Sequence, residues 1–369
     1  MYRRPTFAII HLDALVHNFN EVCHLAQDRS LVVPVVKSDA YGHGCIRVSK
    51  ELIKAGAQRL AVSLTEEAVE LRETGVAVPI LVLGGIYPAQ AKEIIEQGLT
   101  PVISTASMAN ALIEASEAMR KTIAVHIKVE TGLGRMGVQT EDVSSFLHYL
   151  RKRPYLSVEG VCTSFSSIDD VEFSKKQFHL FERVAKEAEQ IAGKPLLRHL
   201  AHTGGLICGL TQPGWLIRPG IMLCGYTRGL KSSGFNLRPV LTWKTEIFKI
   251  EKYPAGYPIG YSGLFRTTSE SRIALLPLGY SDGLLRSYMG RGEVLIRGRR
   301  VPLVGRFSMD WTSAEVGHLP EVREGDEVIV IGRQGSEFIS AEEVAERSGT
   351  IADEVLVSIA RRVPRIYQE

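Results

Sequence analysis

The sequence predicts an α/β fold in two domains: an N-terminal (β/α)8 TIM-type barrel over residues 1–235, followed by a C-terminal, mostly antiparallel β domain over residues 236–369. A length of 369 residues is too great for one ordinary core and suits a barrel plus a second domain of roughly a hundred residues. Aliphatic runs alternate with helical patterns in the first part of the chain. After about residue 235, glycine and proline separate the apolar runs instead, so the chain divides there.

The N-terminal part begins its alternation at Leu31–Val36, where five of six residues are aliphatic and four are valine. This composition is typical of a strand buried on both faces. The expected elements that follow are a helix around Ile46–Ala55, a strand at Arg59–Val62, a helix at Thr65–Glu73, a strand at Ile80–Leu83, a helix around Ala89–Glu96, a strand at Ile123–Val129, a helix after Thr140, a strand at Val158–Val161 and a helix at Glu172–Ile191. Eight such units would close as a barrel with its site at the carboxyl ends of the strands.

The C-terminal part contains short apolar runs without helical spacing between them. These runs predict an antiparallel β domain, and they lie at Leu241–Ile250, Ile273–Leu278, Val294–Ile296, Val301–Val304 and Glu327–Ile331. The boundary between the domains is expected in the glycine- and serine-containing stretch 229–234.

Composition excludes several classes of protein. The chain is 45% hydrophobic and 23% charged, and its net charge of +3 is too small to favour nucleic acid or a membrane surface as a partner. No apolar run approaches a membrane span and no signal peptide is recognisable, so a cytoplasmic location is expected by default. Five cysteines without a CxxC pair fit reduced thiols better than a disulfide framework or a zinc site, and we expect no metal.

Lys37 closes the first aliphatic run and is followed at once by a loop that contains Tyr41, Gly42, His43 and Gly44. From its position alone, this lysine is either solvated at the end of its strand or used in the site into which the strand points. The loop favours the second interpretation, because glycines let the backbone approach a ligand and the two rings can stack or titrate.

Other polar residues recur at the ends of the expected strands. Lys128 and Arg135 flank a glycine-rich turn, although an arginine there could simply face solvent. The stretches 199–205 and 218–221 place glycines after strands, where backbone N–H groups can bind a phosphate, although tight turns alone would also require glycine. Tyr261 and Tyr280 stand beside glycines in the second part, and each taken singly could be a buried core tyrosine.

Six segments together resemble the alanine racemase family, the fold-type III pyridoxal phosphate enzymes, from about Phe7 to Tyr367. The segments occur in order and with sensible spacing, at Val36–Gly44, His126–Gly137, Arg218–Ile221, Gly279–Gly283, Val304–Asp310 and Arg362–Tyr367. The resemblance implies racemisation of L-alanine and D-alanine with pyridoxal 5'-phosphate, in an isomerase that supplies D-alanine for peptidoglycan.

The resemblance also implies how the reaction is catalysed. Lys37 would bind the cofactor and act as a base on one face of the substrate, and Tyr261 would act on the opposite face. Because the family supplies this tyrosine from the partner subunit, a homodimer with shared active sites is expected. The remaining roles are implied in the same way.

Arg218 would face the pyridine nitrogen, and an arginine cannot accept a proton from it. Arg135 would contact the cofactor and the substrate carboxylate, which Tyr280 and Met309 would also hold. Lys128 is a possible carbamylated lysine that would orient Arg135. The other residues expected around the cofactor are Tyr41, Ser164, His199, Thr203, Gly220 and Ile221.

Three positions depart from the family pattern. Ser164 stands in place of a histidine, His202 in place of an asparagine, and Asp353 in place of a tyrosine that helps to close the pocket and reach the phosphate. An aspartate would repel a phosphate unless a cation intervenes. These departures predict a roomier pocket and weaker binding of the cofactor.

Four alternatives to a strict alanine racemase follow from the departures and from related folds. A broader racemase would accept serine or larger side chains, and a degenerate homologue would bind the cofactor without catalysis. A cofactor-carrier barrel would lack the second domain and Tyr261, while a related decarboxylase would place an acid where Arg218 stands.

Overall fold

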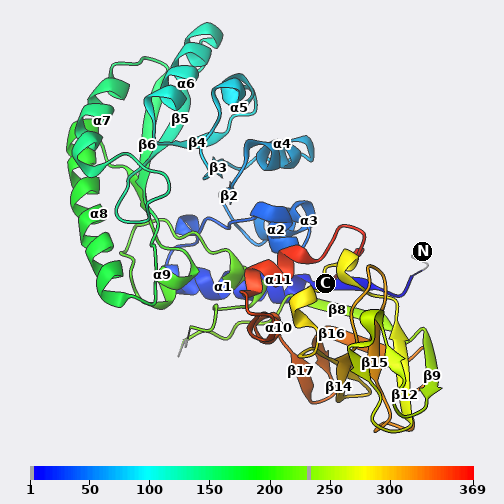
Figure 1. The fold of residues 1–369 in the computed structure, drawn as a ribbon. Coiled ribbons are helices and arrows are strands. Elements are labelled where there is room, and N and C mark those ends of the chain that lie inside the picture. The colour runs from blue at the N-terminus through cyan, green and yellow to red at the C-terminus, as the bar shows by residue number, and fades with distance from the viewer. Residues whose placement is uncertain (1–3, 231–233) are drawn as a thin grey trace.

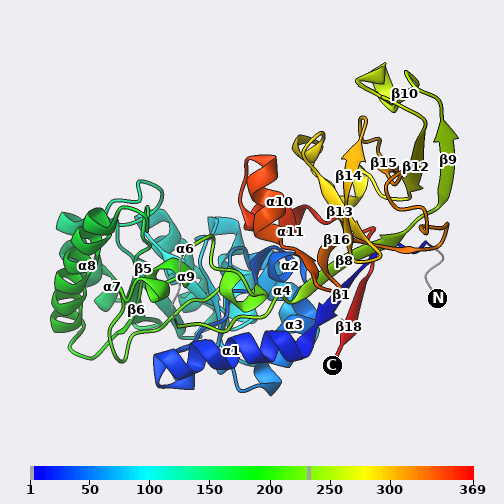
Figure 2. The same cartoon turned by 90° about the horizontal axis from the view of Figure 1, so that it is seen from below.

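The computed structural model describes residues 4–230 and 234–369 of the chain. Figure 1 shows a curled α/β part in blue to green and a strand-rich part in yellow to red. The parallel sheet of the first part has six strands in the order β2-β3-β4-β5-β6-β7. The sheet of the second part has ten strands, and Figure 2 shows it beside α10 and α11.

The six parallel strands are buried because helices connect each strand to the next and cover the sheet. The strands are β2 Leu60–Val62, β3 Ile80–Val82, β4 Thr100–Ile103, β5 Ile123–Lys128, β6 Leu156–Cys162 and β7 Leu197–His199. The helices of this part are α1 Leu12–Ala26, α2 Lys37–Gly42, α3 Cys45–Lys54, α4 Thr65–Glu73, α5 Ala91–Glu96, α6 Ala106–Met119, α7 Val143–Arg151, α8 Val171–Ala192 and α9 Thr203–Ile207.

Helix α8 illustrates how local sequence sets these elements. Asp170 caps its first turn by accepting a hydrogen bond from the N–H of Phe173, and Gly193 ends it in the left-handed conformation at φ 68°. Its buried face includes Phe178 and Phe181, which pack on Trp215 with ring centroids 5.5 Å away in each case. The helix predicted at residues 172–191 is therefore confirmed.

The predicted eight-stranded closed barrel is corrected to a curled parallel sheet of six regular strands. The run 31–36 forms only isolated parallel bridges, from Val32 to Ile217 and from Val35 to Ala61. Pro34 has no N–H to donate to a strand ladder, and the chain turns sharply after Val36, so no regular strand is completed there. A third bridge joins His199 to Leu216.

The larger sheet is mostly antiparallel, as the sequence predicts. Its strands are β1 Phe7–His11, β8 Leu241–Glu246, β9 Lys249–Tyr253, β12 Ser271–Leu276, β13 Glu293–Ile296, β14 Arg299–Val304, β15 Thr312–Glu315, β16 Glu327–Gln334, β17 Glu337–Ile339 and β18 Arg365–Gln368. The exception is β1, which pairs in parallel with β18 and antiparallel with β8. The N-terminal strand therefore belongs to the sheet of the second part, which the sequence analysis did not foresee.

The strand-rich part also contains the hairpin β10 Pro258–Ile259 and β11 Phe265–Arg266, and the helices α10 Ala341–Ser348 and α11 Ala352–Ser358. The single run expected at 241–250 is divided between β8 and β9. The expected boundary at 229–234 includes residues 231–233, which lie outside the described residues.

One continuous buried cluster extends through both parts, from Phe19 and Phe181 to Trp243 and Tyr288. Helix α11 packs against α2, and the backbone of Leu356 lies so close to Gly42 that a side chain at Gly42 would collide with it. All five cysteines are free thiols. Over residues 4–230 and 234–369, no helix is both long enough and apolar enough to cross a membrane.

Candidate active site

A cavity of about 730 Å³ lies at the carboxyl ends of the parallel strands. Its lining includes the residues that directly follow β2 and β3, the last residue of β5, and residues two or three positions after β6 and β7, which is where the sequence analysis expected the site. Nine of the predicted site residues line it: Lys37, Tyr41, Lys128, Arg135, Ser164, Thr203, Arg218, Gly220 and Ile221. The structure therefore brings these residues from five separate segments of sequence to one place.

The turn that follows Lys37 is left-handed. Residues 38–41, none of them glycine, have φ between 52° and 55° and ψ between 40° and 52°. Left-handed helical conformation costs about 1–2 kcal/mol for each such residue, so surrounding contacts must hold the turn in place. Sequence reasoning missed this turn because it expected glycines alone to supply unusual conformations.

Three side chains hold the left-handed turn. One oxygen of the Glu67 carboxylate accepts from the N–H of Ser38 at 2.6 Å, and the other accepts from Ser63 and Leu64 at 2.8 and 3.0 Å. The Asp39 carboxylate accepts from the N–H of Cys45 at 2.7 Å. Arg365, on β18, donates from Nε to the carbonyl oxygen of Gly42 at 3.0 Å. The turn is thus held from α4, from its own sequence and from the C-terminal strand.

Arg218 is a buried cation that lines the cavity. Its side chain donates from Nη2 to the carbonyl oxygens of Thr163 at 2.7 Å and Leu200 at 3.3 Å. Its Nε is buried and has no hydrogen-bond partner among the residues that the structure describes. A buried donor without an acceptor is unfavourable, so a bound group that placed an acceptor atom against Arg218 would stabilise this side chain.

Two buried histidines form a pair near enough to Arg218 for its charge to affect them. His126 Nδ1 and His199 Nε2 are 2.7 Å apart, and His126 Nε2 lies 3.4 Å from a carboxylate oxygen of Glu159. Burial lowers the pKa of both histidines, and the charge of Arg218 lowers both further, so both are neutral at pH 7. His199, predicted to touch the cofactor, is fully buried and is not among the residues that line the cavity.

Lys128 ends β5 and is only 4% exposed. Its Nζ donates to Ser164 Oγ at 2.9 Å, so the serine that replaces the expected histidine has a defined partner. Burial lowers the pKa of Lys128 to about 8, and the cations Arg218 and Arg135 act in the same direction. A larger share of this amine is therefore neutral near pH 7 than for an ordinary lysine.

The turn that carries Arg135 is shaped by Glu130, which the sequence analysis did not single out. Its carboxylate accepts hydrogen bonds from the N–H groups of Gly132, Leu133 and Gly134, at 2.5, 2.7 and 3.1 Å. A carboxylate two residues before a run of backbone donors is a signal that sequence reasoning could have used.

The expected phosphate-binding residues meet at one end of the cavity. A side chain at Gly220 would collide with the Tyr41 hydroxyl, so glycine allows the ring to reach this backbone. Thr203 begins α9, and its Oγ1 lies 3.4 Å from the N–H of Met222 in the adjacent 3₁₀ turn Ile221–Cys224. The first N–H groups of helical turns have no partner within the turn, and they suit an anion.

His202 caps α9 rather than entering a charge pair. Its Nδ1 accepts a hydrogen bond from the N–H of Gly204 at 3.1 Å. Burial, together with Arg218 and Arg228, lowers the pKa of His202 to about 4, so the ring is neutral at pH 7.

Tyr261, Tyr280 and Met309 are not brought to this cavity by their own chain. They lie on the strand-rich part with 69%, 40% and 53% of their surfaces exposed. Tyr280 and Met309 belong to touching segments, because the N–H of Tyr280 donates to the carbonyl of Ser308 at 3.1 Å and that of Ser281 to the carbonyl of Met309 at 3.0 Å. The core-tyrosine alternative is wrong for both tyrosines.

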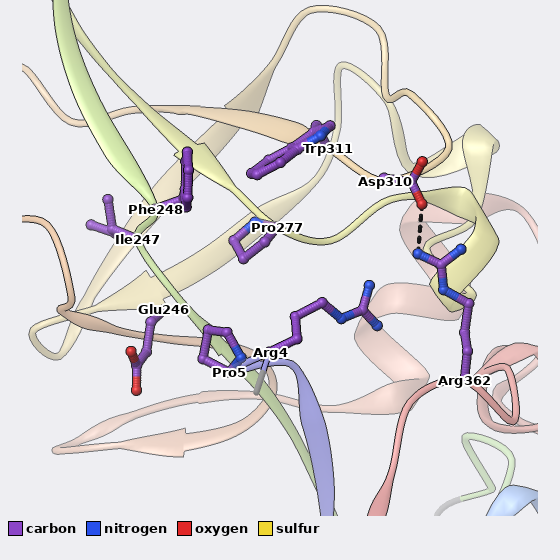
Figure 3. Close-up of a pocket in the computed structure, with 9 residues that line it drawn as sticks. All are labelled: Arg4, Pro5, Glu246, Ile247, Phe248, Pro277, Asp310, Trp311 and Arg362. Carbon is purple, nitrogen blue, oxygen red and sulfur yellow. Dashed lines mark hydrogen bonds and ion pairs between the residues drawn. The ribbon is translucent and has the colours of Figure 1, made fainter. Parts of the chain in front are cut away.

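A second cavity, of about 590 Å³, lies within the strand-rich part and is shown in Figure 3. Phe248 and Trp311 line one side, and Arg362 pairs with Asp310 at 2.5 Å on the other. This cavity contains none of the predicted site residues and no lysine. Over the described parts of the chain, moreover, no group of three or more His, Cys, Asp or Glu side chains could hold a metal ion.

Comparisons with known proteins show the family of the chain. Residues 10–228 match the family described as alanine racemase, N-terminal domain, and residues 240–367 match alanine racemase, C-terminal domain. The chain is 39% identical over 369 residues to the alanine racemase of Halothermothrix orenii, with 99% of this chain and 97% of the relative covered. It is 41% identical over 355 residues to that of Syntrophobacter fumaroxidans, with 95% and 94% covered.

Solved structures give the same result. The alanine racemase from D-cycloserine producing Streptomyces lavendulae aligns with a TM-score of 0.94 at 30% identity, covering 100% of this chain and 98% of that one. The alanine racemase from Bacillus anthracis with bound L-Ala-P aligns with a TM-score of 0.90 at 34% identity, covering 100% and 96%. Matches of this extent place the chain among amino-acid racemases, a class of isomerases. More narrowly, the chain belongs to the alanine racemase family, and the predicted resemblance and enzyme class are confirmed.

Proposed function

We propose that the chain racemises L-alanine and D-alanine with pyridoxal 5'-phosphate, by a two-base mechanism that uses Lys37 and Tyr261. The observation that carries the proposal is that a lysine and a buried arginine with an unpartnered Nε line one cavity at the strand ends. Family membership supports the reaction, because the relatives are named alanine racemases. We propose further that residues 1–235 hold the cofactor and residues 236–369 supply Tyr261.

The residues present fit this cofactor. Arg218 Nε needs an acceptor, which the pyridine nitrogen would provide. Gly220 lets the Tyr41 hydroxyl approach its backbone, and this hydroxyl, Thr203 and the backbone of Gly220 and Ile221 would hold the phosphate. When bound, the cofactor supplies a carbonyl that reacts with amines and a ring that withdraws electrons from the substrate Cα. Because arginine cannot accept a proton, Arg218 would keep the ring nitrogen unprotonated and so restrain that withdrawal, which favours prompt return of the proton.

The bases would act from opposite faces of the substrate. Lys37 Nζ would remove or return the Cα proton on one face, and Tyr261 Oη would do so on the other. The wide exposure of Tyr261 supports its supply to a partner subunit, since its own chain leaves it outside the cavity. Other large apolar side chains are exposed on the same strand-rich part, namely Phe248, Leu264 and Trp311, as expected of a surface that a second copy covers in a homodimer.

The remaining residues would bind and orient. Arg135 would hold the substrate carboxylate, with Tyr280 and Met309 of the partner subunit completing that contact. Lys128 would carry a carbamate, because only a neutral amine adds carbon dioxide and burial makes this amine more often neutral. We assign His199 to the layer behind Arg218, and we expect the enzyme to work in the cytoplasm, where D-alanine for peptidoglycan is required.

A second candidate is a racemase of broader specificity. Ser164 is smaller than the expected histidine, and its hydroxyl is engaged by Lys128, so it leaves room in the cavity. Such an enzyme would turn over serine or larger amino acids as well as alanine. A degenerate, non-catalytic homologue would bind pyridoxal 5'-phosphate and racemise nothing.

The decisive experiment combines single variants with mixed dimers. Lys37→Ala and Tyr261→Phe should each abolish loss of optical rotation, and Tyr261→Phe should keep solvent-deuterium exchange at Cα only for the enantiomer whose proton faces Lys37. Tyr257→Phe, a change at another exposed tyrosine of the same segment, should alter neither property. If the two chains share sites, random mixing of the two inactive variants makes half of the dimers mixed, each with one intact site, and restores about a quarter of wild-type activity. No recovery on mixing, with dimers confirmed, would contradict the shared-site mechanism.

A further inference from the structure

Arg228 also lines the cavity, although nothing in the sequence analysis singled it out. Its guanidinium makes a bidentate pair with Asp353, from Nε to Oδ2 at 3.0 Å and from Nη2 to Oδ1 at 2.5 Å. The Asp353 side chain is 15% exposed and that of Arg228 is 46% exposed. The aspartate that was expected to repel a phosphate is therefore already paired with a cation.

The turn around Arg228 is built to present this side chain. Arg228 is not glycine, yet its φ is 60°, in the left-handed region. A carboxylate oxygen of Glu342 accepts hydrogen bonds from the N–H groups on both sides of it, Thr227 and Gly229, each at 3.1 Å. Glu342 lies in the first turn of α10 and Asp353 in the first turn of α11, so two helices fix the backbone and the head of one arginine.

The pair with Asp353 leaves donors free. A guanidinium has five N–H donors, and the bidentate pair uses two of them. No other hydrogen bond joins this guanidinium to a described residue, and Arg228 is near enough to affect the pKa of Tyr41, one of the expected phosphate ligands. The free donors thus belong to the end of the cavity where Tyr41, Thr203 and Gly220 meet.

We propose that Arg228 binds the phosphate of the cofactor and that Asp353 is a positioning residue that orients its guanidinium. This inference rests on the proposed use of pyridoxal 5'-phosphate. A phosphate group offers several charged acceptor oxygens, which suit a fixed guanidinium with free donors. The aspartate at 353, which departs from the family pattern, and Arg228 then act together: Arg228 contacts the phosphate and Asp353 orients Arg228.

The test compares a ligand pair that differs only in the phosphate. Pyridoxine 5'-phosphate and pyridoxine have no aldehyde, so their binding to the full-length apoprotein is reversible and is measured directly by calorimetry. Arg228→Gln should weaken the binding of pyridoxine 5'-phosphate about 10- to 100-fold and change the affinity for pyridoxine less than about twofold. Arg228→Lys should retain part of the affinity that Arg228→Gln loses. Arg297→Gln is the matched control, because Arg297 makes an equivalent bidentate pair with Asp326 outside the cavity, at 2.6 and 2.8 Å.

The positioning role has its own readout, the ratio of the two affinities. Asp353→Asn should lower the ratio of the affinity for pyridoxine 5'-phosphate to that for pyridoxine less than Arg228→Gln does, because the amide oxygen still accepts one hydrogen bond. The double variant should lower this ratio no further than Arg228→Gln alone. An equal loss for both ligands, or none, in a folded Arg228→Gln protein would overturn the phosphate contact. A gain for pyridoxine 5'-phosphate in Asp353→Asn would overturn the positioning role. If the wild type bound neither ligand, the proposed cofactor itself would be refuted.

Discussion

The carboxylate of Glu67 supports the left-handed turn that carries Lys37, and its removal makes a specific prediction. Glu67→Ala deletes the acceptor of three backbone donors, on Ser38, Ser63 and Leu64. We expect this change to destabilise the fold and also to loosen the turn, so that less cofactor is bound at Lys37.

The expected size follows from the contacts. Four left-handed residues store about 4–8 kcal/mol at about 1–2 kcal/mol each. A hydrogen bond to a charged acceptor contributes about 1.5–3 kcal/mol when buried, and these bonds are partly exposed, so the loss of three should cost about 2–4 kcal/mol. Glu67→Gln keeps one acceptor oxygen and should cost about half as much.

Two measurements test this prediction. The free energy of unfolding is obtained from urea unfolding of the apoprotein at fixed protein concentration. Cofactor loading is measured separately, from the absorbance of pyridoxal 5'-phosphate bound after it is added back to the apoprotein. Glu73→Ala is the control, because Glu73 lies on the same helix, is exposed and makes no hydrogen bond to a described residue; it should change stability by less than about 0.5 kcal/mol. Equal stability and equal cofactor loading in Glu67→Ala and Glu73→Ala would refute the argument that Glu67 holds the turn.

Three further changes test other parts of the site. Burial lowers the pKa of Lys128 from its ordinary 10.5 to about 8, so the folded apoprotein binds this proton less well than the unfolded chain does. In buffer free of carbon dioxide, the free energy of unfolding of the wild type should therefore rise by about 3 kcal/mol between pH 8 and 10.5, relative to that of Lys128→Met. Parallel plots of unfolding free energy against pH for the two proteins would contradict this prediction. Gly220→Ala should displace the Tyr41 ring and weaken pyridoxine 5'-phosphate at least about tenfold by calorimetry, with partial recovery in the double variant with Tyr41→Phe. Ser164→His should narrow a broad substrate range toward alanine, measured as relative kcat/KM across amino acids; turnover of alanine alone by the wild type would show that the roomier pocket is wrong.

Much of the fold follows from local patterns. The helix at 65–73 and the strands near 60, 80, 123 and 156 were predicted because each is a short apolar run or a helical period bounded by turn residues. The strand expected at 31–36 has the right composition, but Pro34 and the sharp turn after Val36 prevent a regular ladder. The position of β1 in the second sheet could not be predicted, since its partners Trp243 and Ile366 are more than two hundred residues away in sequence.

The candidate site, like the fold, could be predicted where local sequence carries the signal and not where distant segments meet. Motifs predicted nine residues that the structure brings to one cavity, because they lie at or after the carboxyl ends of parallel strands or parallel bridges, and these ends converge. The supporting carboxylates were missed, since Glu67 and Glu342 act on backbone groups of other segments. Pairs such as Arg228 and Asp353 are 125 residues apart, so no local pattern shows that they meet.

In the proposed dimer, the strand-rich part would contribute to two active sites at once, and this leads to a last prediction. Within one chain, Asp353 orients Arg228 beside that chain's own Lys37, whereas Tyr261 would serve the partner subunit. A mixed dimer of a Lys37→Ala chain and a Tyr261→Phe chain keeps one intact site, formed by Lys37 of the second chain and Tyr261 of the first. Adding Asp353→Asn to the first chain should leave the cofactor affinity of that site unchanged, and adding it to the second chain should weaken it.

The measurement is the concentration of pyridoxal 5'-phosphate that half-restores racemase activity to each mixed apodimer. Equal values for the two arrangements would mean that Asp353 does not act within its own chain. A higher half-restoring concentration only when Asp353→Asn accompanies Lys37→Ala would mean that α11, like Tyr261, acts on the active site of the partner subunit. A shift only when Asp353→Asn accompanies Tyr261→Phe follows from the geometry, because the contacts of α11 and β18 with the lysine turn, through Leu356 and Arg365, lie within one chain.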